Sequence, residues 1–228
     1  MNKEEKYQNI IKTLSGKSKL KQDVYDNTKN AFDLLNDVLS DLTDRCNAEI
    51  KGTNERISLK YTQNGEFDVQ LKVAGDMLVF NMHSNIFQFD RSHEIWKTKY
   101  VANNFDAGYS GVITVYNFLA DSFKYNRSED LGYLIARIFI NKDNHFFVQG
   151  KRQTGFGFST LGSKEVDRSS MEKIVYAAIQ YCLDFDLLVP PYDNVKLAAV
   201  GQIHKSISDS KLKTGKRVGF QFRSDDID

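Results

Sequence analysis

The sequence is poor in cysteine and has almost no net charge. Its two cysteines, Cys46 and Cys182, lie far apart, so they form neither a disulfide framework nor a metal-ligand pair. We expect both thiols to be reduced and buried. The formal net charge is +1 at pH 7, which excludes a partner that is selected by bulk charge. Any electrostatic recognition must therefore come from a local group of charges.

Long apolar runs are also missing. No stretch is long enough to cross a bilayer, and Met1–Lys6 is followed by no apolar segment of the kind that a secretory signal has. Together with the scarcity of cysteine, these absences predict a soluble, cytoplasmic protein that does not bind a membrane.

The composition is that of a folded globular protein. The 228 residues are 41% hydrophobic and 27% charged, and a chain of this length buries a core without disulfides or metals. Aromatic residues make up 12%, and they favour strands because they fit a half-buried pleated surface. No repeat or linker marks a boundary, so we expect a single domain over 1–228. Residues 1–15 are predicted to be a peripheral helix, and 207–228 a basic tail.

Helical spacing is clearest near the N-terminus. A short amphipathic helix that ends at Ser15-Gly16 is predicted from Tyr7, Ile10, Ile11 and Leu14. A longer helix is predicted from about Lys21 to Cys46, with an apolar face made of Val24, Thr28, Ala31, Phe32, Leu35, Val38, Leu39 and Leu42. The opposite face carries Asp26, Asp33, Asp37, Asp41 and Asp44. Such an acidic face is either a solvated surface or a docking stripe for a basic partner.

Period-two alternation follows the long helix and predicts a four-stranded antiparallel meander. Asn64-Gly65 is typical of a two-residue hairpin turn, and it separates the predicted strands 57–61 and 67–73. The third and fourth strands are expected over 77–82 and 86–89. The alternation buries one face of this sheet and leaves the other face wet or covered by helices.

The second half of the chain mixes strands and helices. Residues 91–110 are irregular, and 111–119 read as a strand. Residues 130–150 fit either a helix or a hairpin, and we favour the hairpin because strand-forming residues flank the turn tetrapeptide Asn141–Asn144. Residues 156–161 are a candidate for one more strand.

Two C-terminal helices complete the expected fold. Ser169 is predicted to cap a helix that reaches Cys182, and Asp193 to cap a final helix. The predicted fold class is therefore α+β. It is a mostly antiparallel β-sheet, built of a meander plus a hairpin, packed against a long N-terminal helix and two C-terminal helices.

Catalytic motifs are present only in part. Gly16-Lys17-Ser18 lacks the earlier glycine of a phosphate-binding loop, because Ile11 stands at that position. Gly108–Gly111 lacks the second glycine of a nucleophile elbow around its serine. The four histidines show no ligand spacing, and the best local group is His93-Glu94 with Asp90. We expect no metal and no cofactor, and no catalytic residue is identified.

The stretch from Gln149 to Phe158 joins a basic pair to glycines and aromatic residues. Its Gly-Phe-Gly-Phe segment, 155–158, resembles the first ribonucleoprotein motif of RNA-recognition domains, and 113–118 resembles the second. The resemblance implies that aromatic side chains stack on bases while basic residues hold phosphates. A helix over 130–140 would complete the βαββαβ order. The alternative is a strand, a turn and a strand whose glycines serve the backbone geometry.

Three classes of function fit these observations. The first is a non-catalytic intracellular binding or interaction protein for a protein or small-molecule ligand, and self-association is compatible with it. The second is a nucleic-acid-binding protein that uses the basic and aromatic stretch and the basic tail. Its candidate nucleic-acid or anion-binding residues are Lys151, Arg152, Phe156, Phe158, Lys211, Lys213, Lys216 and Arg217. The third is a hydrolase or nuclease whose site residues are dispersed along the chain.

Overall fold

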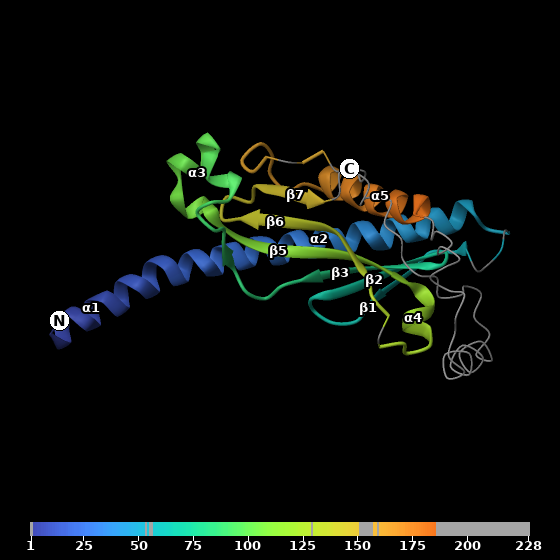
Figure 1. The fold of residues 1–228 in the computed structure, drawn as a ribbon, viewed down its shortest axis with the longest axis horizontal. Helices are drawn as coiled ribbons and strands as arrows, with labels where there is room; N and C mark the ends of the chain where they lie inside the picture. Colours follow the sequence, from blue (N-terminus) through green and yellow to red (C-terminus); the bar gives the residue numbers. More distant parts are fainter. Residues whose placement is uncertain are drawn as a thin grey trace, which may run out of the picture.

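One antiparallel sheet organises the fold of the computed structural model, which describes residues 2–52, 54, 57–128, 130–150, 157–158 and 160–185 (Figure 1). Within these residues seven strands form the sheet, and the path of neighbouring strands is β1-β2-β3-β5-β6-β7. The α+β fold class is therefore confirmed. The predicted final helix after Asp193 and the basic tail lie outside the described residues.

The elements have the following bounds. The helices are α1 (Lys3–Thr13), α2 (Lys19–Glu49), α3 (Lys99–Asn103), α4 (Ala120–Lys124) and α5 (Arg168–Asp184). The strands are β1 (Lys60–Gln63), β2 (Asp68–Val73), β3 (Asp76–Met82), β4 (Phe87–Gln88), β5 (Tyr109–Leu119), β6 (Tyr133–Asn141) and β7 (Phe146–Gly150). A π-helical turn, Leu14–Ser18, joins α1 to α2, and 3₁₀ turns Glu94–Lys97 and Phe105–Gly108 flank α3.

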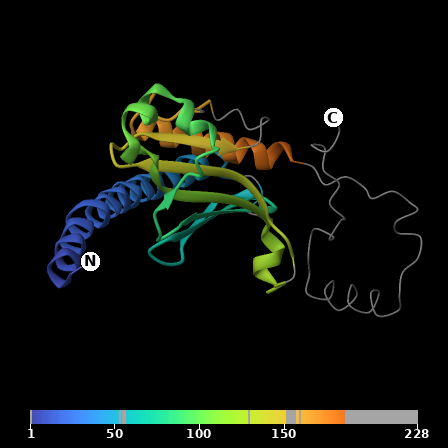
Figure 2. The ribbon, with the colours of Figure 1, turned by 60° about the vertical axis from the view of Figure 1, so that its left-hand side comes forward.

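The two predicted N-terminal helices form one continuous rod. The expected break at Ser15-Gly16 is wrong, because both residues lie in the π-helical turn between α1 and α2. Ser15 Oγ donates to the Ile11 carbonyl at 2.8 Å, and a mid-helix glycine costs only about 1 kcal/mol relative to alanine. The helix therefore propagates outward from the part that the core anchors. In both ribbon views α1 projects away from the sheet (Figures 1 and 2).

The apolar face predicted for the longer helix is confirmed. All eight residues are buried, and Phe32, Leu35 and Leu39 are completely enclosed. They pack with α5 and the inward side chains of the strands in the main core. The five aspartates predicted on the opposite face are exposed. Helices α2 and α5 therefore cover one face of the sheet, and the aspartates of α2 face away from the core.

The first three strands form the predicted antiparallel meander, but its first turn differs. Neither Asn64 nor Gly65 has positive φ, and the hairpin closes at the pair Gln63–Val69. The two-residue turn lies instead at Ala74-Gly75, where Ala74 has φ +50°.

The predicted fourth strand is placed differently from the meander expectation. Strand β4 pairs with β5, and β3 pairs with β5 over seven residues. The eleven-residue β5 displaces β4 because it sets fully buried side chains such as Ile113 and Val115 beside β3. The second half of the sheet therefore joins the first through β5.

The hairpin expected after residue 133 is confirmed as β6 and β7. The alternative helix over 130–140 is wrong, so the βαββαβ order of the RNA-recognition resemblance is not formed. Helix α5 is formed, but it begins at Arg168 and contains the predicted cap Ser169; its N-cap is Asp167, which accepts from Ser170 N–H at 2.7 Å. Of residues 156–161, the described Gly157, Phe158, Thr160 and Leu161 form no strand.

The opposite face of the sheet is covered at its ends. Residues of the 3₁₀ turns and α3 form a second apolar cluster with Val112, Phe139 and Phe147 at one end, and α4 contacts β3 and β5 at the other. Cys182 is buried as expected, whereas Cys46 is partly exposed, and neither forms a disulfide. Among the helices of the described residues, none combines the length and the apolar character needed to span a bilayer.

Candidate functional site

The central part of the sheet face opposite α2 and α5 is open, in the sense that no helix of the described ranges packs over it. We call this surface the open face. Alternation along β3 and β5 defines its members on these strands, and in β6 a bulge places Ile135 and Ala136 of the main core between the outward residues Leu134 and Arg137. The open face includes Met77, the buried Val79, Asn81, Thr114, Tyr116, Phe118, Leu134 and Arg137, and it continues onto β2 through Asp68, Gln70 and Lys72. It therefore combines apolar and aromatic side chains with a guanidinium group and with the charged side chains of β2.

Aromatic rings occupy the α4 end of the open face. Tyr116 lies opposite Val79, and its ring centroid is 6.2 Å from that of Phe118. Phe118 contacts Phe123 of α4 edge to face, with 5.3 Å between the centroids. A Cβ at Gly132 would stand 2.3 Å from Phe118 Cε1, so a glycine is needed to admit this ring. Phe118 is thus fixed between α4 and the backbone, and the partly exposed Tyr116 is the aromatic ring beside it.

Arg137 supplies a guanidinium group beside the aromatic rings of the open face. It stands opposite Thr114 on β5, one side-chain step along the strand from Tyr116. Its Nη2 donates to Gln149 Oε1, and its guanidinium carbon lies 5.4 Å from the centroid of Phe139. A guanidinium has five N–H donors. The described residues engage it through the one hydrogen bond to Gln149, so it is suited to receive an anion.

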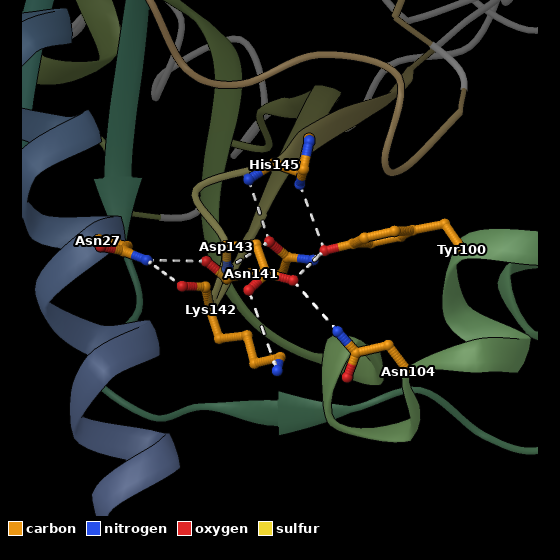
Figure 3. Close-up of polar contacts among 7 residues, drawn as sticks. All are labelled: Asn27, Tyr100, Asn104, Asn141, Lys142, Asp143 and His145. Atoms are coloured by element: carbon orange, nitrogen blue, oxygen red, sulfur yellow. Dashed lines mark hydrogen bonds and ion pairs between the residues drawn. The ribbon is translucent and has the colours of Figure 1, made fainter.

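A second group of polar side chains gathers at the β6–β7 turn (Figure 3). Asn141 is completely buried at the end of β6, and its Oδ1 accepts from Asp143 N–H and His145 N–H at 3.0 Å each. Its Nδ2 donates to Tyr100 Oη at 3.0 Å. Asn27 Nδ2 of α2 donates to the carbonyls of Asn141 and Lys142, at 3.1 and 2.8 Å. The turn is thereby tied to two helices, α2 and α3.

Tyr100 is the centre of this turn network. Its phenol donates to Asp143 Oδ2, and His145 Nδ1 lies 3.3 Å from Tyr100 Oη. Desolvation, followed by the hydrogen bond to Asp143, raises the pKa of Tyr100 to about 12. A phenol with this pKa stays protonated at neutral pH and acts as a donor, not as a base. The polar groups of the network hydrogen-bond to one another, so the network stabilises the conformation of the turn.

The high pKa of Tyr100 leads to a pH prediction. Because folding raises the pKa from 10.0 to about 12, the neutral phenol stabilises the fold below pH 10, and this contribution is lost as pH rises from 10 to 12. We expect the difference between the phenolate absorbance titrations of the wild type and Tyr100→Phe to have its midpoint near pH 12. A midpoint near pH 10 would contradict the buried phenol–carboxylate contact.

The partial catalytic motifs do not assemble into a reactive centre. Ser110, in the elbow-like segment, is completely buried in β5, so no substrate reaches its hydroxyl. His93 Nδ1 accepts from Ile95 N–H at 3.2 Å, and Asp90 accepts from Ser92, whose hydrogen bonds lower the pKa of Asp90. Within the described ranges, no three His, Cys, Asp or Glu side chains lie close enough together to hold a metal ion.

Of the sequence-predicted site residues, Phe158 is the one that the structure describes. It is partly buried against the main core, with its ring centroid 5.0 Å from that of Phe146 and with Lys164 Nζ 5.8 Å from its own centroid. Lys151, Arg152, Phe156, Lys211, Lys213, Lys216 and Arg217 lie outside the described residues. The prediction of a nucleic-acid site at these residues stays a prediction.

The open face was only partly accessible to sequence reasoning. Tyr116 and Phe118 belong to the segment that resembles the second ribonucleoprotein motif, and both project from the central strand β5. Arg137 carries no motif, and the signal that places it is its alternation with Ile138 in β6. Comparisons with protein-family models, with curated proteins and with solved structures find no match to this chain.

Proposed function

We propose that this protein is a non-catalytic binding protein and that the open face is its ligand-binding surface. The supporting observation is the pairing of Tyr116 and its apolar neighbours with Arg137 on a sheet face that the described helices leave uncovered. An exposed sheet face of this composition is costly in water unless a ligand uses it. Among the residues that the structure describes, no group of three His, Cys, Asp or Glu side chains could hold a metal ion.

The chemistry of the open face favours a small amphipathic anion as the ligand. The partly exposed Met77 and Tyr116 offer an apolar area on either side of the buried Val79, and Arg137 offers a planar cation about two residue positions away. Arginine binds carboxylate, sulfonate or phosphate oxygens in pairs, which fixes the ligand's orientation. Asn81 and Thr114 add an amide and a hydroxyl group on the same face. A ligand that joins an aromatic ring to an anionic group matches both halves.

Anilinonaphthalene sulfonate is a suitable probe, because it joins fused rings to a sulfonate. We expect the folded protein to enhance the fluorescence of this probe. Tyr116→Ala and Arg137→Gln should each weaken the binding about five- to tenfold, because each removes roughly one stacking contact or one charged hydrogen bond. Lys173→Gln, on the exposed side of α5 and therefore on the other side of the sheet, is a matched control that should leave the affinity unchanged. Equal binding by Tyr116→Ala, Arg137→Gln and the wild type would exclude the open face.

Nucleic acid is the second candidate, and a specific observation favours it. Tyr116 and Phe118, from the segment that resembles the second ribonucleoprotein motif, project from a central strand onto the open face beside Arg137. Bases stack on aromatic side chains in this way, and the affinity falls with salt. A fluorescein-labelled twelve-nucleotide uridine oligomer tests this candidate. If the oligomer binds and Tyr116→Ala weakens its binding, the open face is assigned to single-stranded nucleic acid. If the oligomer does not bind at 50 mM salt, the small anion is left as the ligand class.

A further inference from the structure

The N-terminal rod from Lys3 to Glu49 has opposite charges at its two ends. Residues 2–21 contain Lys3, Lys6, Lys12, Lys17, Lys19 and Lys21 against Glu4 and Glu5, a net charge of +4. Residues 22–49 contain Asp23, Asp26, Asp33, Asp37, Asp41, Asp44 and Glu49 against Lys29 and Arg45, a net charge of −5. A protein whose total charge is +1 therefore carries a strongly polarised helix on its surface.

The basic end of the rod also carries an apolar stripe. Tyr7, Ile10, Ile11 and Leu14 are 44–57% exposed, and no residue of α1 is buried. Four large apolar side chains within two helical turns are more than the scattered apolar residues of an ordinary surface. Among the described residues nothing covers this stripe, and α1 projects from the body in both ribbon views (Figures 1 and 2).

The acidic end of the rod borders a cleft. The cleft lies between α2 and α5 and has a volume of about 260 Å³. Val38 and Leu42 give it apolar walls, and Tyr176, which is 44% exposed, stands at its side. Asp41, Asp44, Glu172, Arg45 and Arg168 also line it, a net charge of −1, and Arg168 already donates to Asp41 and Glu172. A cleft of this volume takes side chains of a third helix that packs across α2 and α5, and not the helix itself.

We propose that two copies of this chain form an antiparallel dimer in which α1 of each copy packs across the α2–α5 cleft of the other. The centres of the apolar stripe and of the cleft are about 30 residues apart, or roughly 45 Å of helix. Two antiparallel rods related by a two-fold axis near residue 25 therefore form both contacts at once. This arrangement is closed and isologous, so it does not extend into a filament.

The charge pattern fits this alignment residue by residue. A two-fold axis near residue 25 places Lys6 opposite Asp44 of the partner subunit. In the same register Lys17 falls opposite Asp33 of the partner subunit, and Lys6 and Lys17 lie on the same side of the helix because eleven residues make about three turns. Both lysines and both aspartates are exposed. An alignment of two α1 helices against each other would instead bring two segments of charge +4 together, which is unfavourable.

Symmetry makes a modest contact sufficient. A stable interface buries roughly 1,600 Å² in total, and the two-fold axis uses each α1–cleft contact twice, so one contact needs to bury only about half of that area. Apolar burial of the stripe then supplies affinity, while the opposed charges set the register and the rate of association. The dimer is therefore expected to weaken as salt rises, without dissociating fully at moderate salt.

Sedimentation velocity over a hundredfold range of protein concentration tests the dimer directly. We expect a concentration-dependent dimer in 50 mM NaCl and an increase in Kd of about tenfold or more in 1 M NaCl. Ile10→Ser with Ile11→Ser should raise Kd at least about tenfold, while Gln8→Ser on the same exposed helix should leave it unchanged. A monomer at every concentration overturns the proposal.

A charge-reversal pair fixes the register of the contact. Lys6→Glu with Lys17→Glu places like charges against an intact acidic α2, and Asp33→Lys with Asp44→Lys does the same against an intact α1. Each variant alone should be monomeric, with an unchanged circular dichroism spectrum. An equimolar mixture should restore a dimer of one chain of each kind, because both contacts are then complementary. A dimer that survives in either variant alone, or a mixture that stays monomeric, overturns the alignment.

A basic amphipathic helix can also bind an anionic lipid surface, and vesicle binding distinguishes this alternative from the dimer. Vesicles of phosphatidylcholine with 30% phosphatidylserine are mixed with the protein and sedimented. At protein concentrations where the chain is fully dimeric, we expect no binding to the vesicles, because α1 is then buried in the dimer interface. Vesicle binding by a monomer through Ile10 and Ile11 assigns α1 to an anionic lipid surface and overturns the proposal.

Discussion

Gly111→Ala is expected to destabilise the fold by about 2–3 kcal/mol, the cost of overpacking a tight core contact. Gly111 lies in β5, where α2 crosses the sheet, and a Cβ at this position would stand 2.1 Å from Thr28 Oγ1 and 2.8 Å from Thr28 Cβ. Thr28 is completely buried, so it cannot turn away. The helix must move off the sheet. Urea unfolding followed by circular dichroism measures the loss of free energy.

Gly65→Ala is the matched control for this prediction. No atom lies within 4 Å of a Cβ built at Gly65, and its φ is not positive, so the change should alter stability by less than about 0.5 kcal/mol. Adding Thr28→Ala to Gly111→Ala removes the closest atom, Oγ1, and should recover part of the loss. The double-mutant cycle should then show coupling of about 1 kcal/mol. Additive effects would mean that α2 and β5 do not meet at this point.

The parts of the fold that the sequence predicts well depend on local periodicity. A helical face repeats every 3.6 residues, so the buried residues of α2, from Val24 to Leu42, could be identified without knowing what they pack against. The β6–β7 hairpin was equally readable, because strand-forming residues flank a polar turn around Asp143. Both patterns are complete within about twenty residues of chain.

The sequence-based predictions are wrong where segments far apart in the chain compete for the same pairing partner. Whether β4 or β5 pairs with β3 depends on which strand buries more apolar surface there, and β5 lies about thirty residues farther along the chain. The tight turn was assigned to Asn64-Gly65 on propensity, whereas the pairing of β1 with β2 places a longer loop there. Turn propensity amounts to a fraction of a kcal/mol, which the register of a buried sheet overrides.

The candidate site follows the same division. Alternation predicts that one face of the sheet is not in the core, but it does not reveal which part of that face helices leave open. Tyr116 could be identified from the segment that resembles a ribonucleoprotein motif. Arg137 lies near Tyr116 only because β6 pairs with β5, and the sequence does not reveal this pairing. The turn network joins Asn27 to the Asn141 carbonyl across 114 residues and Tyr100 to Asn141 across 41. No local pattern encodes such contacts.

Asn141→Ala is expected to cost about 3 kcal/mol, because it removes three part-buried hydrogen bonds. The Asn141 side chain accepts from two backbone N–H groups and donates to Tyr100, and it is completely buried. A typical hydrogen bond within a protein contributes about 1 kcal/mol, so the three bonds account for the estimate. Unfolding free energies in urea, measured at pH 7, report the loss.

Asn104→Ala separates the role of Asn141 from that of the network as a whole. Asn104, the C-cap residue of α3, contacts the same Asp143 carboxylate, but at 3.3 Å and in an exposed setting, so its removal should cost less than about 0.5 kcal/mol. If Asn141→Ala unfolds with wild-type free energy, the buried amide does not hold the turn, and α2, α3 and the β6–β7 hairpin must be joined by their apolar contacts alone.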